Sequence, residues 1–136
     1  MIGKVPRPMG LTPSTDATGF DALYGLELTE VGEQLARGRV RVRDQLRQPA
    51  GSVHGGVYAA VADALAVRGT VAGSLDQRAV GLTTHTSVLH PIDDGAMHAT
   101  AVRRHRGRTT WVWEVEIADD AGRVCVVARV TVAVPG

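Results

Sequence analysis

Two periodicities of hydrophobic and polar positions divide the 136-residue chain into segments. Alternation with a period of two, typical of a strand with one buried face, begins at Tyr24 and is clearest over 35–42, where valines oppose arginines. A short helical turn is expected before it, near 20–23. The second half of the chain contains four more strand-like segments, separated by turns that contain glycine. The predicted strands are 24–30, 35–42, 80–90, 97–104, 109–118 and 124–134.

One long helix is predicted between the two groups of strands. Residues 53–72 contain no proline and place Ala, Val and Leu on every side of a helical wheel. A helix that is apolar all round has to be enclosed by the rest of its domain, and Gly73 is suited to end it in the left-handed conformation. The order β-β-α-β-β-β-β predicts an α+β fold, an antiparallel sheet wrapped around one long central helix.

Composition indicates a single domain. With 44% hydrophobic residues and a net charge of +1, the chain can form one core without disulfides or metals, and its lone Cys125 excludes an internal disulfide. Residues 1–19, rich in Pro, Gly and Thr, are expected to be a mobile lead-in to a domain over 20–136. The N-terminus lacks a signal-peptide pattern, and Asp63 and Arg68 argue against a membrane span in the helix. A cytoplasmic protein with no membrane contact is therefore expected.

Asp63 is the position in the helix that packing does not explain. It is the only acidic residue between Asp44 and Asp76, and burying a carboxylate without a partner is costly. Arg68 stands at i+5, off the i+3 and i+4 positions where helix neighbours meet. An arginine from a strand could still pair with Asp63. We favour the alternative, that Asp63 belongs to a catalytic site, because costly buried acids concentrate at such sites.

The start of the helix carries a second candidate feature, Gly55 followed by Gly56. The first N–H groups of a helix have no internal partners and carry the positive end of the helix dipole, so they can bind a developing oxyanion. Without a Cβ, the amide of Gly55 could approach a substrate carbonyl closely. Taken alone, the two glycines are more typical of a tight turn before a helix.

Helix geometry relates these two features to oligomeric state. Gly55 and Asp63 are eight residues apart, which is about 12 Å along a helix. A catalytic base or nucleophile has to lie within about 3–3.5 Å of the reacting atoms or their water. If Gly55 polarises a carbonyl, the acid that acts on it must come from another chain. The spacing therefore predicts a two-fold homodimer with shared active sites.

These residues resemble a known pattern, that of the hotdog-fold acyl-CoA thioesterases. Within that family, the chain resembles the group that contains the hydrolases of phenylacetyl-CoA, 4-hydroxybenzoyl-CoA and 1,4-dihydroxy-2-naphthoyl-CoA. The similarity covers about residues 24–134. A histidine followed by two glycines is weak evidence alone. It is strong with a glutamine six residues before and an acid nine after. The matching residues are Gln48, 51–57, 62–63, 80–83, 105–108, 113–117 and 122–125.

The resemblance implies hydrolysis of an aromatic or medium-length acyl-CoA to free acid and CoA. The Gly55 amide would bind the thioester oxygen, Gln48 and His54 would orient the thioester and the departing thiolate, and Asp63 would be the nucleophile or the general base. Family members with Asp at this position use a hydroxyl on the following strand, which implies that Thr83 positions the water. A strand threonine is also common for its β propensity alone.

The resemblance also places a basic turn near the coenzyme nucleotide. Arg106, Gly107, Arg108 and Thr109 match the family's coenzyme-contacting turn, and His90 matches a position that is often basic. Arginine suits phosphate oxygens, although a solvated basic hairpin would look the same. CoA is part of the substrate, so no separate cofactor and no metal are expected. The family commonly forms homotetramers, which implies a dimer of dimers.

Other functions remain as alternatives. A non-catalytic acyl-CoA sensor on the same fold would bind coenzyme without turnover, and a hotdog dehydratase would need a histidine paired with an acid across the site. The small net charge and the scarcity of aromatic residues near the arginines argue against nucleic-acid binding. We expect the alternating arginines of the second strand to form a solvated face, although contact with phosphate or with a second dimer stays open. They are Arg37, Arg39, Arg41 and Arg43.

Overall fold

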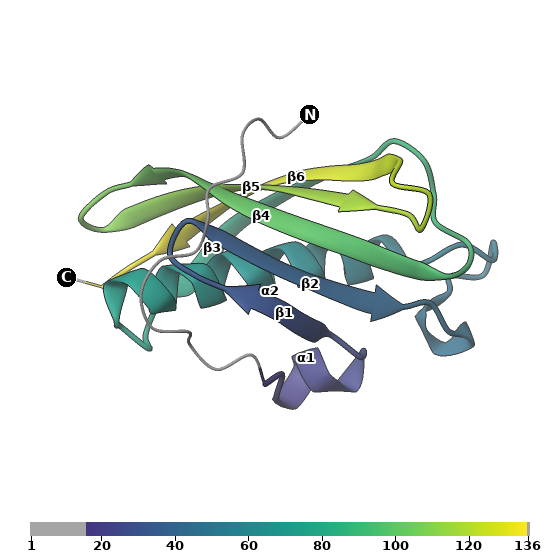
Figure 1. Ribbon diagram of the computed structural model, residues 1–136, viewed down its shortest axis with the longest axis horizontal. Coiled ribbons are helices and arrows are strands. Elements are labelled where there is room, and N and C mark those ends of the chain that lie inside the picture. The colour runs from purple at the N-terminus through teal and green to yellow at the C-terminus, as the bar shows by residue number, and fades with distance from the viewer. Residues whose placement is uncertain (1–15, 136) are drawn as a thin grey trace.

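The computed structural model describes residues 16–135 and shows one antiparallel sheet packed against one long helix, α2 (Figure 1). The six strands are ordered β1-β2-β4-β5-β6-β3 across the sheet. The predicted α+β architecture, a sheet wrapped around a central helix, is confirmed. In chain order the elements are α1 (Gly19–Leu23), β1 (Glu27–Val31), β2 (Leu35–Arg41), a short 3-10 helix (Asp44–Leu46), α2 (Gly55–Ser74), β3 (Val80–Val88), β4 (Ala96–Arg106), β5 (Thr110–Ala118) and β6 (Val124–Ala133).

Most differences from the predicted boundaries lie at glycines and strand ends. The first strand begins at Glu27 rather than at Tyr24, because Tyr24 ends α1 and Gly25 turns the chain with φ of 89°. Gly73 does not end α2. Leu75 takes the left-handed conformation instead, with φ of 58°. Most of the lead-in expected over residues 1–19 lies outside the described residues.

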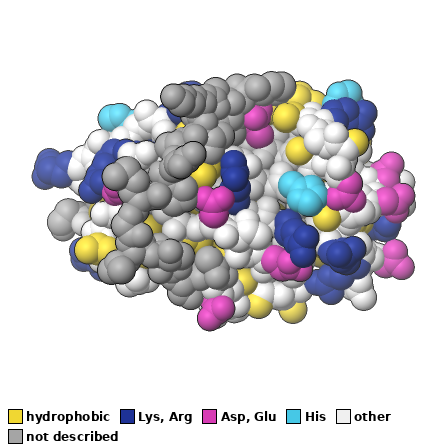
Figure 2. Space-filling view, in the orientation of Figure 1, with side chains coloured by type: hydrophobic (Ala, Val, Ile, Leu, Met, Phe, Trp, Pro, Cys, Tyr) yellow, Lys and Arg dark blue, Asp and Glu magenta, His cyan; other side chains and the backbone are white. Residues whose placement is uncertain are grey.

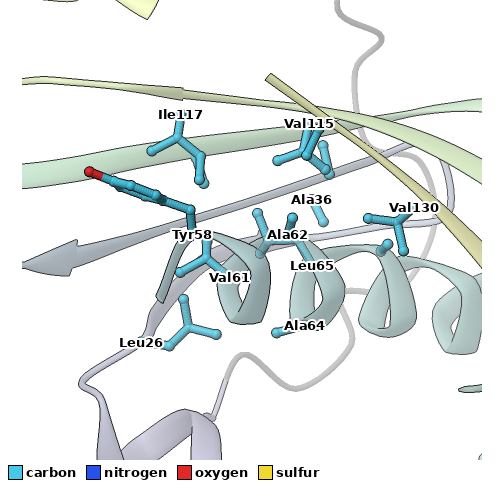
Figure 3. Close-up of a cluster of buried hydrophobic side chains, with 14 of the residues drawn as sticks. Leu26, Ala36, Tyr58, Val61, Ala62, Ala64, Leu65, Val115, Ile117 and Val130 are labelled. Atoms are coloured by element: carbon cyan, nitrogen blue, oxygen red, sulfur yellow. The ribbon is translucent and has the colours of Figure 1, made fainter. Parts of the chain in front are cut away.

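The core lies between α2 and the sheet. Tyr58, Val61 and Leu65 project from the helix toward strand residues that include Val115 and Ile117 (Figure 3). Figure 3 shows the small side chain of Ala62 facing the sheet as well, so the sheet approaches the helix closely there. Apolar burial of this kind contributes about 25 cal/mol per Å² and is the main stabilising term of the fold.

Two glycines inside α2 allow the tryptophans of β5 to pack on the helix surface. A Cβ added at Gly69 would lie 2.3 Å from the Trp113 ring, and one added at Gly73 would lie 2.5 Å from the Trp111 ring. The indole N–H of Trp113 donates a 2.9 Å hydrogen bond to Thr70 Oγ1. Gly73 therefore serves packing rather than helix termination.

The outer face of the sheet carries paired charges. Arg37 and Arg39 of β2 form ion pairs with Glu30 and Glu27 of β1, at 3.2 and 2.8 Å. Glu114 of β5 similarly pairs with arginines of β4 and β6. Basic and acidic side chains are interspersed over the face shown in Figure 2. This pairing agrees with a solvated charged face for the β2 arginines.

Gly69→Ala is expected to destabilise the protein, because the new methyl group would overlap the Trp113 ring. Overpacking costs about 1–3 kcal/mol, which outweighs the gain of up to about 1 kcal/mol in helix propensity. Thermal unfolding should show a fall in Tm of several degrees. At Gly55, an added Cβ meets no atom within 4 Å, so Gly55→Ala is the matched control. An unchanged Tm for Gly69→Ala would contradict the packing described here.

Candidate active site

The loop over residues 47–53 leads into the start of α2, and its two ends are joined by backbone pairing. Arg47 and Val53 form an isolated antiparallel bridge, and the Gln48 N–H donates to the Ser52 carbonyl at 2.8 Å. The Gln48 side-chain amide donates to Ser52 Oγ at 2.9 Å. Gly51 permits the turn, with φ of 102°. The loop thus holds the Gln48 side chain in a defined orientation next to the helix start.

Arg47 braces this loop from the side. Its guanidinium donates to the carbonyl oxygens of Gly51 and Asp93, at 2.8 and 2.5 Å. It also forms ion pairs of 3.2 Å with the carboxylates of Asp44 and Asp94. Sequence reasoning missed Arg47, because no local spacing reveals that one side chain joins two separate loops.

His54 caps α2 and distinguishes its two N-terminal glycines. The Gly56 N–H donates to His54 Nδ1 at 2.8 Å, so the neutral ring carries its proton on Nε2. No partner for the Gly55 N–H is found within residues 16–135. An added Cβ at Gly55 would meet open space. Gly55 therefore presents a free backbone donor at the positive end of the helix dipole.

Asp63 lies two turns further along α2, on the same side as Gly56 and Ala60. Its side chain is half-buried, and among the described residues no hydrogen bond or ion pair to its carboxylate is present. The strand arginine that could have neutralised it is thus not found there. Burial, and secondarily the negative charge of Asp21, raise the pKa of Asp63.

β3 comes close to this carboxylate at Gly81, which has no side chain. A Cβ at Gly81 would lie 2.0 Å from Asp63 Oδ1, so only glycine leaves room for the acid there. Gly81 precedes a register shift in the pairing of β3 with β6. The sequence around Gly81 does not reveal this contact, because it depends on how β3 packs against α2.

An apolar groove of about 300 Å³ opens beside the start of α2. Aromatic residues of α1 and its end form one wall, and Phe20 and Tyr24 meet there edge to face with ring centroids 5.2 Å apart. Helix residues on either side of Gly55 form the other wall. The lining residues are Phe20, Tyr24, Gln45, Leu46, Arg47, His54, Gly56, Val57 and Ala60. Gly55 therefore lies between two residues, His54 and Gly56, that line an apolar groove.

Thr83 lies on the side of the sheet that faces away from α2. It pairs with Thr131, whereas Thr84 pairs with the buried Val130 on the helix-facing side. The structure thus does not bring the Thr83 hydroxyl together with Asp63 of the same chain. Of these two adjacent threonines, Thr84 is the one that faces the helix, a distinction set by the register shift before Thr83.

The proposed coenzyme residues occupy two places. His90 follows β3 in the segment that passes the start of α2, where the Ile92 carbonyl accepts from Val53 N–H at 3.0 Å. The basic turn lies at the other end of α2, where Arg106 pairs with Glu33 at 2.8 Å and lies over the Trp111 ring.

The remainder of that turn is tightly built. The Gly107 N–H donates to the Thr110 carbonyl at 2.8 Å, and a Cβ at Gly107 would overlap that oxygen. Arg108 and Thr109 are exposed at the tip. Gly55 and Gly73 are 18 residues apart, about 27 Å along the helix. The turn is thus far from Gly55 of its own chain.

Within residues 16–135, no three His, Cys, Asp or Glu side chains converge as a metal site would require. Across the same part of the chain, no helix combines the length and hydropathy needed to cross a membrane.

Comparison with known proteins finds relatives that are named as esterases, thioesterases or hydrolases. A Mycobacterium tuberculosis protein whose name proposes an esterase is 36% identical over 127 residues, covering 88% of each chain. Its solved structure superposes with a TM-score of 0.80 at 37% identity, covering 84% of this chain and 94% of that one. A proofreading thioesterase of Cronobacter turicensis is 34% identical over 116 residues, 82% of each chain. A 1,4-dihydroxy-2-naphthoyl-CoA hydrolase of Listeria monocytogenes is 31% identical, covering 85% of this chain and 95% of that protein.

One protein-family model matches the part of the chain that forms the sheet and α2. The model described as the acyl-CoA thioesterase N-terminal domain matches residues 26–133, from just before β1 to the end of β6. With the hotdog architecture and the thioesterase relatives, this match shows that the chain belongs to the acyl-CoA thioesterase family and is a thioester hydrolase.

Proposed function

We propose that the enzyme hydrolyses an aromatic or medium-length acyl-CoA, with Asp63 as the nucleophile or general base and Gly55 as the oxyanion donor. The observation that carries this proposal is the half-buried carboxylate of Asp63, which has no hydrogen-bond or ion-pair partner among residues 16–135. The Gly55 amide polarises the thioester carbonyl and stabilises the charge that develops on its oxygen. Asp63 either attacks the carbonyl carbon, giving a mixed anhydride that water then opens, or removes a proton from an attacking water. Both routes break the C–S bond and release CoA as the thiol.

Two chains complete each site. In one chain the amide and the acid are about 12 Å apart along α2, so the acid at a given Gly55 comes from a partner subunit. The side of α2 that carries Asp63 supports this arrangement, because Ala60 and Val67 leave it apolar and incompletely buried. β3, at the edge of the sheet, exposes Val80 and Leu82 beside it. A second copy of the chain would cover these surfaces.

The acyl group and the coenzyme extend in opposite directions from Gly55. The groove beside α1 suits the acyl group, because it is apolar and adjoins the free amide. Gln48 and His54 orient the thioester and the thiolate at the groove edge. His90 and the turn over 106–109 would contact the coenzyme phosphates. Since that turn is far from Gly55 of its own chain, it would reach a coenzyme held by another subunit of a dimer of dimers.

Asp63→Asn tests the chemistry. We expect kcat to fall at least about 100-fold, because removal of a positioned base costs about 10²–10⁴-fold. Thiol release from a panel of acyl-CoA substrates measures this, with the parent assayed beside the variant. Equal rates would exclude Asp63 from the chemistry, and a parent that binds but hydrolyses none of the substrates would favour the acyl-CoA sensor.

The same variant should change the pH dependence of stability. Folding raises the pKa of Asp63 above that of an ordinary aspartate. The folded protein therefore loses stability as the pH rises above the ordinary aspartate pKa, because the buried carboxyl has to ionise. Asp63→Asn removes that cost. It should therefore unfold a few degrees higher than the parent at pH 7, with the difference narrowing as pH falls toward 4. A Tm difference that is independent of pH would contradict the burial of an unpaired charge.

Hybrid dimers test the shared site. Gly55→Pro removes the N–H and suits the first position of a helix. The extended His54 backbone before it, with ψ of 134°, tolerates proline. Each homodimer of Gly55→Pro or Asp63→Asn should be inactive. Subunit exchange between the two should restore up to about half of the parent activity per hybrid, because one of its two sites is intact. No recovery in hybrids verified by mass spectrometry would place the acid and the amide in one chain.

Phe20→Ala tests the acyl groove. Phe20 lines the groove and is otherwise exposed, so its removal should spare folding. We expect kcat/KM for phenylacetyl-CoA to fall about 10-fold, with a smaller loss for hexanoyl-CoA. Leu23→Ala is the matched control, since Leu23 lies on the same helix, is 73% exposed and does not line the groove. Equal losses for both variants would exclude the groove as the acyl site.

A further inference from the structure

The side chain of Arg43 ends on backbone rather than on an acid. Arg39 of β2 forms an ion pair of 2.8 Å with Glu27. The Arg43 guanidinium instead donates a 2.7 Å hydrogen bond to the backbone carbonyl of Leu23, the last residue of α1. This hydrogen bond joins two segments that are 20 residues apart in the chain. Arg43 therefore does more than add a solvated charge to the surface.

The same guanidinium lies next to the turn that follows α1. A Cβ added at Gly25 would lie 3.9 Å from Arg43 Nη2 and 4.0 Å from Arg43 Nε, which is ordinary van der Waals contact. Gly25 has a φ of 89°, in the left-handed region that glycine adopts most readily. Arg43 thus lies beside the end of α1 both at the Leu23 carbonyl and at the Gly25 turn.

Few contacts fix the position of α1. No residue of Gly19–Leu23 is buried, and Figure 1 shows the helix outside the sheet, beyond the edge strand β1. Tyr24, only 5% exposed, anchors the end of the helix in the core and donates a hydrogen bond to Asp21. Arg68 of α2 donates to the Asp16 carbonyl before the helix. Because burial contributes little to α1 itself, hydrogen bonds at its ends determine how it is oriented.

The backbone of Arg43 leads directly into another side of the acyl groove. Arg43 immediately precedes the 3-10 helix Asp44–Leu46. The groove is lined by Gln45 and Leu46 from this segment and by Phe20 and Tyr24 from α1 and its end. One residue therefore belongs to one side of the groove through its backbone and holds the other side through its guanidinium.

We propose that Arg43 is a positioning residue that sets the width of the acyl groove by tying the end of α1 to the segment over 44–47. This inference rests on the proposed use of that groove by the acyl group. Without the hydrogen bond to Leu23, α1 and its Phe20 ring are free to move away from α2. An acyl group that fills the groove is then held less firmly, whereas the coenzyme keeps its contacts.

Arg43→Met is the direct test, because methionine keeps much of the apolar stem and cannot donate to the Leu23 carbonyl. We expect KM for phenylacetyl-CoA to rise about three- to five-fold, the size of effect that the loss of one hydrogen bond produces. We expect kcat to change less than about two-fold, because the chemistry takes place elsewhere. Inhibition by free CoA, which has no acyl group, should be unchanged. Equally weakened inhibition by free CoA would assign Arg43 to a coenzyme phosphate and overturn the proposal.

Two further variants separate the hydrogen bond from the charge. Arg43→Lys keeps a long side chain with a charged donor, so KM should return to within about two-fold of the parent value. Arg39→Met removes an equal charge from β2, where the guanidinium pairs with Glu27 and lines no groove. It should leave KM unchanged. A rise in KM for Arg39→Met equal to that for Arg43→Met would show a general charge effect and overturn the specific role of Arg43.

Amide hydrogen exchange gives a readout that does not depend on activity. The Tyr24 N–H donates to the Phe20 carbonyl at 3.3 Å, and the Gly25 N–H donates to the Ala22 carbonyl at 3.1 Å. Both amides should exchange faster in Arg43→Met than in the parent, because α1 opens more often. They should exchange at the parent rate in Arg39→Met. Unchanged exchange in Arg43→Met would overturn the proposal.

Combination with Phe20→Ala locates the effect in α1 and separates it from the proposed function. Once the Phe20 ring is absent, Arg43→Met should raise KM by less than about two-fold further, because both changes act on the same wall. A full additional rise would show that Arg43 acts independently of α1 and overturn this inference. Failure of the groove as the acyl site appears separately, as equal losses in Phe20→Ala and Leu23→Ala.

Discussion

The rest of the site depends on one unpaired carboxylate carried by an otherwise apolar helix. Asp63 has no neutralising partner among the described residues, and its burial raises its pKa. The surroundings fit the acid in detail, since the backbone of Gly81 leaves room for it and a side chain there would overlap it. A fold selected for stability alone would not keep such a group, because the charge costs stability and no hydrogen bond or ion pair from the described residues offsets that cost. Thioester hydrolysis supplies a reason for it.

The packing of α2 against the sheet determines where this acid lies. The tryptophans of β5 rest on Gly69 and Gly73, which sets the rotation of the helix and its distance from the strands. One side of the helix is thereby buried under the sheet, and the side with Asp63 is left incompletely covered. The position of Asp63 thus depends on packing contacts one to three turns away along the helix.

The start of α2 is organised by short polar contacts. Arg47 joins the loop over 47–53 to the segment that follows β3, and His54 uses its Nδ1 to cap the second glycine of the helix. The first glycine, Gly55, keeps its amide free and unshielded. Two adjacent glycines therefore have different tasks. Gly56 accommodates the histidine ring, and Gly55 provides the donor.

The sequence by itself determined the element order, the antiparallel sheet with one enclosed helix, and the unusual character of Gly55 and Asp63. These follow from periodicity, from the absence of proline in the helix and from the cost of an isolated acid, all of which act over a few residues. Only the tertiary structure decided that Gly73 packs against a tryptophan, that Thr83 faces away from α2, and that the backbone of Gly81 lies against Asp63. Such relations depend on strand register and on contacts between distant segments. A single-residue register shift reverses the face of a side chain while leaving the local sequence pattern almost unchanged.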